Sequence, residues 1–152
     1  MQNRTPAITM LLVTAGLLVI GAFLPWATVS AGGFKVSVSG TQGSDGYITL
    51  LCGAYIGFIA WTKMQGKPVA KGMMIGLYVA IGLALAIGVM NFSSIDDAAG
   101  AAALGVSASV GIGLWLTIAA AIVGIVGAVT IRKEDAAGGS TSTTATPPSS
   151  PF

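Results

Sequence analysis

Four long apolar stretches dominate the chain, and polar residues are largely confined to the segments that join or follow them. Each stretch is close to the roughly 17–25 residues that an α-helix needs to cross the hydrocarbon core of a membrane. None of the four contains Asp, Glu, Lys or Arg. The pattern therefore predicts an all-α membrane protein whose residues 1–135 form one four-transmembrane-helix bundle. The predicted spans are residues 7–26, 46–62, 72–92 and 107–131.

The first outer connection, residues 27–45, has a different pattern. Apolar and polar residues alternate over 34–39, which is the period of a β-strand, and Gly32–Gly33 suits a tight turn because glycine accepts positive φ. We therefore expect a small extracellular β-hairpin between the first two spans. Because a two-stranded hairpin is marginal in water, its apolar face should be buried on the helix ends near Trp26 or on another subunit. That face consists of Phe34, Val36 and Val38.

The second outer connection, residues 93–106, and the C-terminal segment are also polar. Ser94 is followed by Asp96 and Asp97, and serine caps helices while carboxylates suit the positive end of a helix dipole. A short new helix is expected to begin there and to run through Ala98–Leu104, and a cation bound by the two aspartates is the alternative. Residues 136–152 are rich in Gly, Ser, Thr and Pro, which predicts a disordered cytoplasmic tail.

Composition and charge support lipid as the solvent of the spans and suggest an orientation. Only 8% of the 152 residues are charged, against about 25% in a typical soluble domain. Six of the seven basic residues lie on one side of the predicted spans, so the positive-inside rule places both termini in the cytoplasm. Trp26 and Trp61 end their spans and are expected at the headgroup level. The six basic residues are Arg4, Lys63, Lys67, Lys71, Arg132 and Lys133.

The first span also resembles a signal peptide, with a cleavage site after Ala31. Its apolar stretch is longer than the usual 7–15 residues of such a region, which favours a span that is retained.

Small residues at every fourth position form the clearest motif within the spans. Such ridges let helix backbones approach closely, which matters in lipid because apolar side chains gain little there by associating. Packing within the chain and association between chains both fit, and the first is favoured for the third span. The expected packing residues are Gly53, Gly57, Gly72, Gly76, Ala80, Ala84, Gly88, Gly113 and Gly124.

Residues for catalysis are scarce. The chain has no His, and its one Cys, Cys52, lies in an apolar run that suits a small buried side chain. Proton relays need ionisable residues at membrane depth, and the spans hold none. We therefore expect no catalytic, metal-binding or cofactor-binding residue, and no nucleic-acid partner because the basic residues do not cluster. A pore lined by hydroxyl groups stays open, against the simpler expectation that each hydroxyl bonds to its own helix.

Two resemblances add expectations. The order of span, extracellular β-element and three further spans resembles the claudin-type tetraspan layout, although the Trp…Gly-Leu-Trp…Cys…Cys signature of that family is lacking. The motifs LPW, SDGYITL and GIGLWL resemble those of small uncharacterised four-span proteins of actinobacteria and their phages. This second resemblance implies a bacterial plasma-membrane location and no assigned activity. The three motifs occupy residues 24–26, 44–50 and 111–116.

These observations favour a non-enzymatic structural or accessory role in the lipid bilayer, exerted through helix packing and through contacts with a membrane partner or with further copies. The alternative is a pore-forming protein or a phage superinfection-exclusion protein, in the form of a homo-oligomeric channel.

Overall fold

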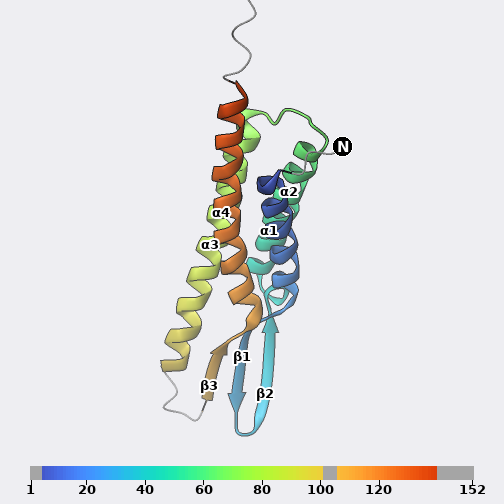
Figure 1. The fold of residues 1–152 in the computed structure, drawn as a ribbon. Helices are drawn as coiled ribbons and strands as arrows, with labels where there is room; N and C mark the ends of the chain where they lie inside the picture. The colour runs from blue at the N-terminus through green and yellow to red at the C-terminus, as the bar shows by residue number, and fades with distance from the viewer. Residues whose placement is uncertain (1–4, 101–105, 140–152) are drawn as a thin grey trace, which may run out of the picture.

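The computed structural model describes residues 5–100 and 106–139, which form a bundle of helices with a small β-sheet at one end (Figure 1). The helices lie side by side, and the strands continue beyond them along the direction of the bundle (Figure 1). The elements in chain order are α1 (Pro6–Phe23), β1 (Pro25–Ala31), β2 (Phe34–Ser39), the 3-10 turn η1 (Gly40–Gln42), α2 (Ser44–Met64), α3 (Lys71–Gly100), β3 (Val106–Val110) and α4 (Ile112–Gly139).

All four α-helices are long and apolar enough to cross a membrane, which confirms the prediction of four membrane-length helices. Large apolar side chains such as Ile20, Leu51 and Met90 lie exposed on the outside of the bundle. Apolar surface of this extent suits lipid and is rare on soluble monomers. The candidate spans are Pro6–Phe23, Ser44–Met64, Lys71–Ile95 and Ile112–Ala137.

The first helix ends earlier than the sequence pattern predicted. It stops at Phe23, and Leu24 is already extended, with φ −77° and ψ 161°. The reason is Pro25, which disfavours helical geometry at the residue before it and has no N–H to continue the helix. Trp26 therefore belongs to β1. It is only 5% exposed and its indole N–H donates to the Gly21 carbonyl at 2.8 Å, so it is a core residue and not the exposed interface anchor that we expected.

The outer β-element has three strands where the sequence predicted two. Gly32 and Gly33 form the expected turn with φ of 55° and 87°, and β1 pairs antiparallel with β2. On its other edge β1 pairs antiparallel with β3, so the strand order is β2-β1-β3. The prediction of helix from residue 107 is wrong, because Ser107 and Ser109 alternate with apolar residues at the strand period. The edge of β1 supplies backbone partners for this segment.

The segment predicted to start a new short helix instead continues α3. The Ser94 hydroxyl donates to the Met90 carbonyl at 2.9 Å, one turn earlier, so Ser94 lies within the helix and caps nothing. No proline or glycine stands between Phe92 and Gly100 to end the helix. Residues 101–104 of the expected short helix lie outside the described residues.

The last helix begins at Ile112 and continues to Gly139, past the predicted end of the fourth span. The first four residues of the segment expected to be a disordered tail are therefore helical. Its residues 140–152 lie outside the described residues.

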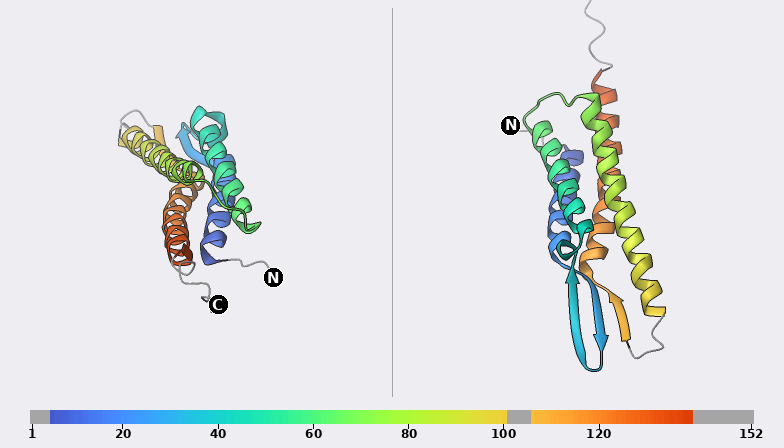
Figure 2. Two further views of the ribbon diagram at one scale, coloured as in Figure 1. Left: turned by 90° about the horizontal axis from the view of Figure 1, so that it is seen from above. Right: turned by 180° about the vertical axis from the view of Figure 1, so that it is seen from behind.

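The helices pack so that α1 contacts both α2 and α4, while α3 contacts α4 and α2 (Figure 2). Leucine, isoleucine and alanine side chains fill the space between them, as in close-packed protein interiors. A second, smaller cluster joins the bundle to the sheet. It consists of Trp26, Ile87 and Leu114, with Phe92, Ile95 and Val110 packed against them.

The two ends of the bundle differ in charge. The start of α1, the end of α4 and the α2–α3 connection lie at one end, opposite the sheet (Figures 1 and 2). We call this the charged end and the other the sheet end. Lys35 and Asp45 belong to the sheet end, and Arg4 lies outside the described residues. The described charged residues of the charged end are Lys63, Lys67, Lys71, Arg132, Lys133, Glu134 and Asp135.

Candidate functional site

The sheet has one apolar and one polar face. Residues paired across antiparallel strands point to the same side of a sheet, so the register defines the two faces. We call the first the apolar sheet face. Its paired rows are Phe34–Ala31, Val36–Val29–Ala108 and Val38–Ala27–Val110, and the rows of the polar face are Lys35–Ser30–Ser107 and Ser37–Thr28–Ser109.

The bundle covers only the nearest row of the apolar sheet face. Exposure along β2 rises from 39% at Val38 to 61% at Val36 and 80% at Phe34, with increasing distance from the helices. The prediction that these three side chains are buried against the helix ends near Trp26 is therefore wrong. The strands extend past α1, α2 and α4, and α3 runs beside β3 at the opposite edge of the sheet from β2, so the helices do not reach the outer residues of β2 (Figure 1). Burial against another subunit stays a prediction.

A hollow of about 200 Å³ lies where the sheet meets the helices. Ala27 and Val38 of the apolar sheet face line it together with Asp45 and Asn91. The Asn91 side-chain amide donates to the Asp45 carboxylate at 2.8 Å and to the Ile87 carbonyl at 3.0 Å. Asp45 lies in the first turn of α2, where the helix dipole favours a negative charge. The pair thus ties α2 to α3 directly beneath the sheet.

Across residues 5–100 and 106–139, no group of three or more His, Cys, Asp or Glu side chains comes together. The pairing of Asn91 with Asp45 could not be predicted from the sequence, because nothing local links residues so far apart in the chain.

Most of the predicted packing residues lie at contacts between helices of the same chain. Ala80 is 8% exposed and Ala84 is fully buried. A Cβ added at each of six glycines would meet a neighbouring helix: Gly53 and Gly57 face α1, Gly76 faces Tyr55, Gly88 faces Ile118, Gly113 faces α1, and Gly124 faces Thr14 and Ile81.

Gly72 is the exception. A Cβ there would have no neighbour within 4 Å, so this exposed position at the start of α3 makes no close contact with another helix.

A close backbone approach between two spans involves a residue that the sequence pattern did not single out. Gly21 of α1 lies against Gly113 of α4, and a Cβ built at Gly113 would be 2.7 Å from the Gly21 carbonyl oxygen. The same Cβ would be 2.9 Å from both the Cβ and the carbonyl oxygen of Leu24. Hydrogen at both glycine positions is what allows α1 and α4 to meet at the sheet end.

Five hydroxyl groups of the spans, which a pore could have used, donate hydrogen bonds to backbone carbonyls. Thr14, Thr49 and Thr117 are fully buried, and each donates to the carbonyl four residues earlier at 2.9 Å. Tyr55 and Tyr78 donate to carbonyl oxygens of neighbouring helices, each at 3.2 Å. These contacts agree with local hydrogen bonding and with helix–helix contacts.

Two tryptophans lie where an interfacial ring is expected. Trp61 is 56% exposed near the charged end of α2. Trp115, in the first turn of α4, is 55% exposed and meets Phe92 edge to face with ring centres 5.4 Å apart. Trp115 takes the place that we had expected Trp26 to occupy at the sheet end. A fourth span that begins at residue 107, as the sequence pattern predicts, would place Trp115 deeper in the membrane, so the pattern did not indicate this role.

Comparison with protein-family models finds no match, and comparison with curated proteins finds no relative. The two resemblances noted from short motifs and from the order of elements therefore stay expectations.

Proposed function

We propose that this protein is a non-enzymatic membrane protein that acts through the apolar sheet face, by packing it against the same face of a second copy. The single observation that carries the proposal is the exposure of Val36 and Phe34, at 61% and 80%, on a face that bears no charged residue. Contiguous exposed apolar surface beyond a membrane anchor is typical of a protein–protein interface.

The orientation of the bundle in the membrane is part of the proposal. Among the described residues, five basic side chains gather at the charged end and only Lys35 lies at the sheet end. The positive-inside rule then places the charged end in the cytoplasm and the sheet outside the plasma membrane. Two copies inserted in this way carry their apolar sheet faces at the same height.

Symmetry favours a second copy packed face to face. The strands run along the bundle (Figure 1). A two-fold axis perpendicular to the membrane leaves the strands of both copies running in the same direction. The β2 edges of two copies therefore cannot pair antiparallel. The same axis does allow two sheets to pack through their faces, about 10 Å apart. Val36 of one copy then lies level with Val36 of the other, while Lys35 on the polar face stays in water.

The expected strength of this contact is modest. Full burial of a Val or Phe side chain contributes about 1.5–3 kcal/mol, and two such residues from each copy are available. Association costs about 4–15 kcal/mol in lost translational and rotational freedom. Confinement of both copies to one membrane reduces this cost. We therefore expect a dimer in the membrane that weakens on dilution in detergent.

Cysteine cross-linking in native membranes tests the proposal. In a Cys52→Ser background, which removes the only cysteine, Val36→Cys should be cross-linked into a dimer by a short thiol-reactive bismaleimide, which can span the roughly 10 Å between facing sheets. Ser37→Cys, the next residue on the polar face, is the matched control and should stay monomeric. Equal cross-linking at both positions, or none at Val36→Cys, would contradict the proposal.

The competing hypothesis is a pore, as in a channel or a phage superinfection-exclusion protein. Its support is weaker, because the buried hydroxyls of the described bundle are bonded to backbone carbonyls and mark no polar path. Conductance in liposomes distinguishes the two hypotheses. A pore predicts ion flux and toxicity on overexpression, and the sheet-mediated contact predicts neither.

A further inference from the structure

A groove at the charged end, far from the sheet, has the features of a second binding site. It runs between α3 and α4 and has a volume of about 650 Å³. Met74, Ile75 and Tyr78 form its apolar wall, and its charged lining residues are Lys71, Arg132 and Asp135.

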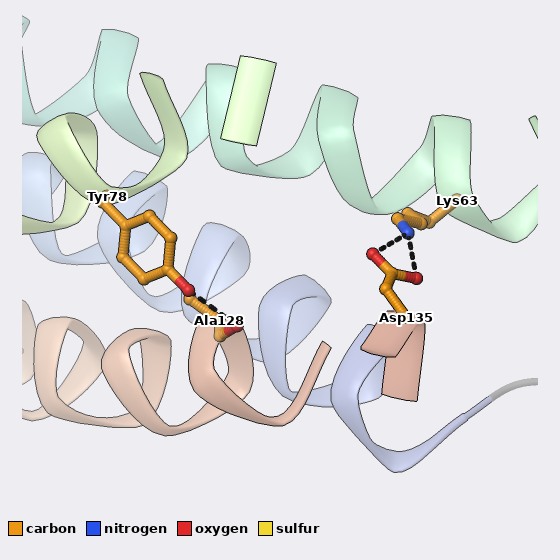
Figure 3. A network of polar contacts seen from close by, with 4 residues as sticks. All are labelled: Lys63, Tyr78, Ala128 and Asp135. Carbon is orange, nitrogen blue, oxygen red and sulfur yellow. Dashed lines mark hydrogen bonds and ion pairs between the residues drawn. The ribbon is translucent and has the colours of Figure 1, made fainter. Parts of the chain in front are cut away.

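The groove is ordered along the bundle from charged to apolar. Lys71 is the first residue of α3, and Tyr78 follows seven residues later, which is roughly 10 Å along the helix. The Tyr78 hydroxyl donates to the Ala128 carbonyl at 3.2 Å, which ties α3 to α4 (Figure 3). Arg132 stands one turn beyond Ala128 on α4. Charge therefore lies at the end of the bundle, and apolar surface lies deeper.

The free charge of the groove is positive. The carboxylate of Asp135 is already paired, since both its oxygens lie 2.7 Å from the Lys63 ammonium nitrogen (Figure 3). Lys71 and Arg132 are exposed, and their side chains make no hydrogen bond or ion pair with another residue of 5–100 and 106–139. Two unpaired cations above an apolar wall attract an anion that carries hydrocarbon.

We propose that this groove binds an anionic phospholipid of the cytoplasmic leaflet. Its phosphate lies between Lys71 and Arg132, where an arginine can bind two phosphate oxygens at once. One acyl chain follows Met74, Ile75 and Tyr78 towards the middle of the membrane. Basic pockets between spans on the cytoplasmic side are suited to such headgroups. A soluble anion would use the two cations but would leave the apolar wall uncovered.

Native mass spectrometry of the full chain in detergent tests this site. We expect the protein to retain one phosphatidylglycerol in preference to phosphatidylcholine. The double variant Lys71→Gln/Arg132→Gln should lose that preference, by about five-fold for each charge removed. The control Lys67→Gln/Lys133→Gln removes the same charge at positions that do not line the groove, and should keep the preference. Equal losses in both double variants would overturn the proposal in favour of a diffuse surface effect.

A second pair of variants tests the apolar wall without changing charge. Ile75→Trp fills the groove and should lower phosphatidylglycerol retention several-fold, while Met90→Trp, also on an exposed position of α3 but at the sheet end, should not. Inorganic phosphate at millimolar concentration should not displace the lipid. Displacement by phosphate, or unchanged retention in Ile75→Trp, would show that the groove is an ion site and not a lipid site.

Discussion

Replacing Gly113 by alanine should loosen the contact between α1 and α4. The new Cβ would lie 2.7 Å from the carbonyl oxygen of Gly21 and 2.9 Å from that of Leu24, and real Cβ atoms essentially never come closer than 3.0 Å. Both oxygens belong to the backbone, so no side-chain rotation relieves the clash. The helices must instead separate, by roughly half an ångström, to restore an ordinary contact.

The expected size of the effect follows from two opposing terms. Overpacking of this kind costs about 1–3 kcal/mol. Alanine gains about 0.5–1 kcal/mol over glycine inside a helix, but less at Gly113, which is the second residue of α4. We therefore expect Gly113→Ala to be destabilised by about 1–2 kcal/mol.

Gly82→Ala is the matched control, since a Cβ at this exposed position in the middle of α3 meets nothing within 4 Å. It should leave stability unchanged or raise it by up to about 1 kcal/mol. Unfolding of the purified proteins in mixed micelles by increasing dodecyl sulfate, followed by circular dichroism, measures both changes. Equal shifts of the two variants in the same direction would refute the close approach of α1 and α4.

Three further predictions concern single features. Trp26→Phe removes the buried hydrogen bond to the Gly21 carbonyl and should lower the free energy of unfolding by about 1–2 kcal/mol in the same assay. An unchanged unfolding midpoint would show that this bond does not hold the sheet to the bundle. Lys63→Gln should change the free energy of unfolding by less than about 1 kcal/mol, because the ion-pair partner of Lys63, Asp135, is 54% exposed. A larger loss would mean that the ion pair is shielded from water. A phosphatase reporter inserted at Gly33 should be active and one at Gly66 inactive, and the reverse result would invert the orientation proposed for the bundle.

Much of the fold could be predicted from local properties of the sequence. Four uncharged stretches of membrane length predict four helices in any packing, because an unpaired backbone in lipid forces helix formation within each segment. Gly32–Gly33 specifies its turn through the φ angles that only glycine adopts easily. The small-residue ridges identified most of the contacts between spans, because hydrogen or a methyl group at such a position permits close approach whichever helix is the neighbour.

The tertiary structure decided what depends on a partner distant in the chain. Residues 106–110 form a strand because β1 offers them an edge, and their period-two pattern alone did not outweigh the apolar stretch that follows. Trp26 is buried because the Gly21 carbonyl, Ile87 and Leu114 surround it, which no local pattern indicates. Asn91 donates to Asp45 because the packing of α2 against α3 brings the two side chains together. The outer rows of the apolar sheet face stay exposed because no helix packs over them. The burial of a side chain and the pairing of a strand depend on residues that are distant in the sequence. Helix length and turn type depend mainly on the residues within the segment itself.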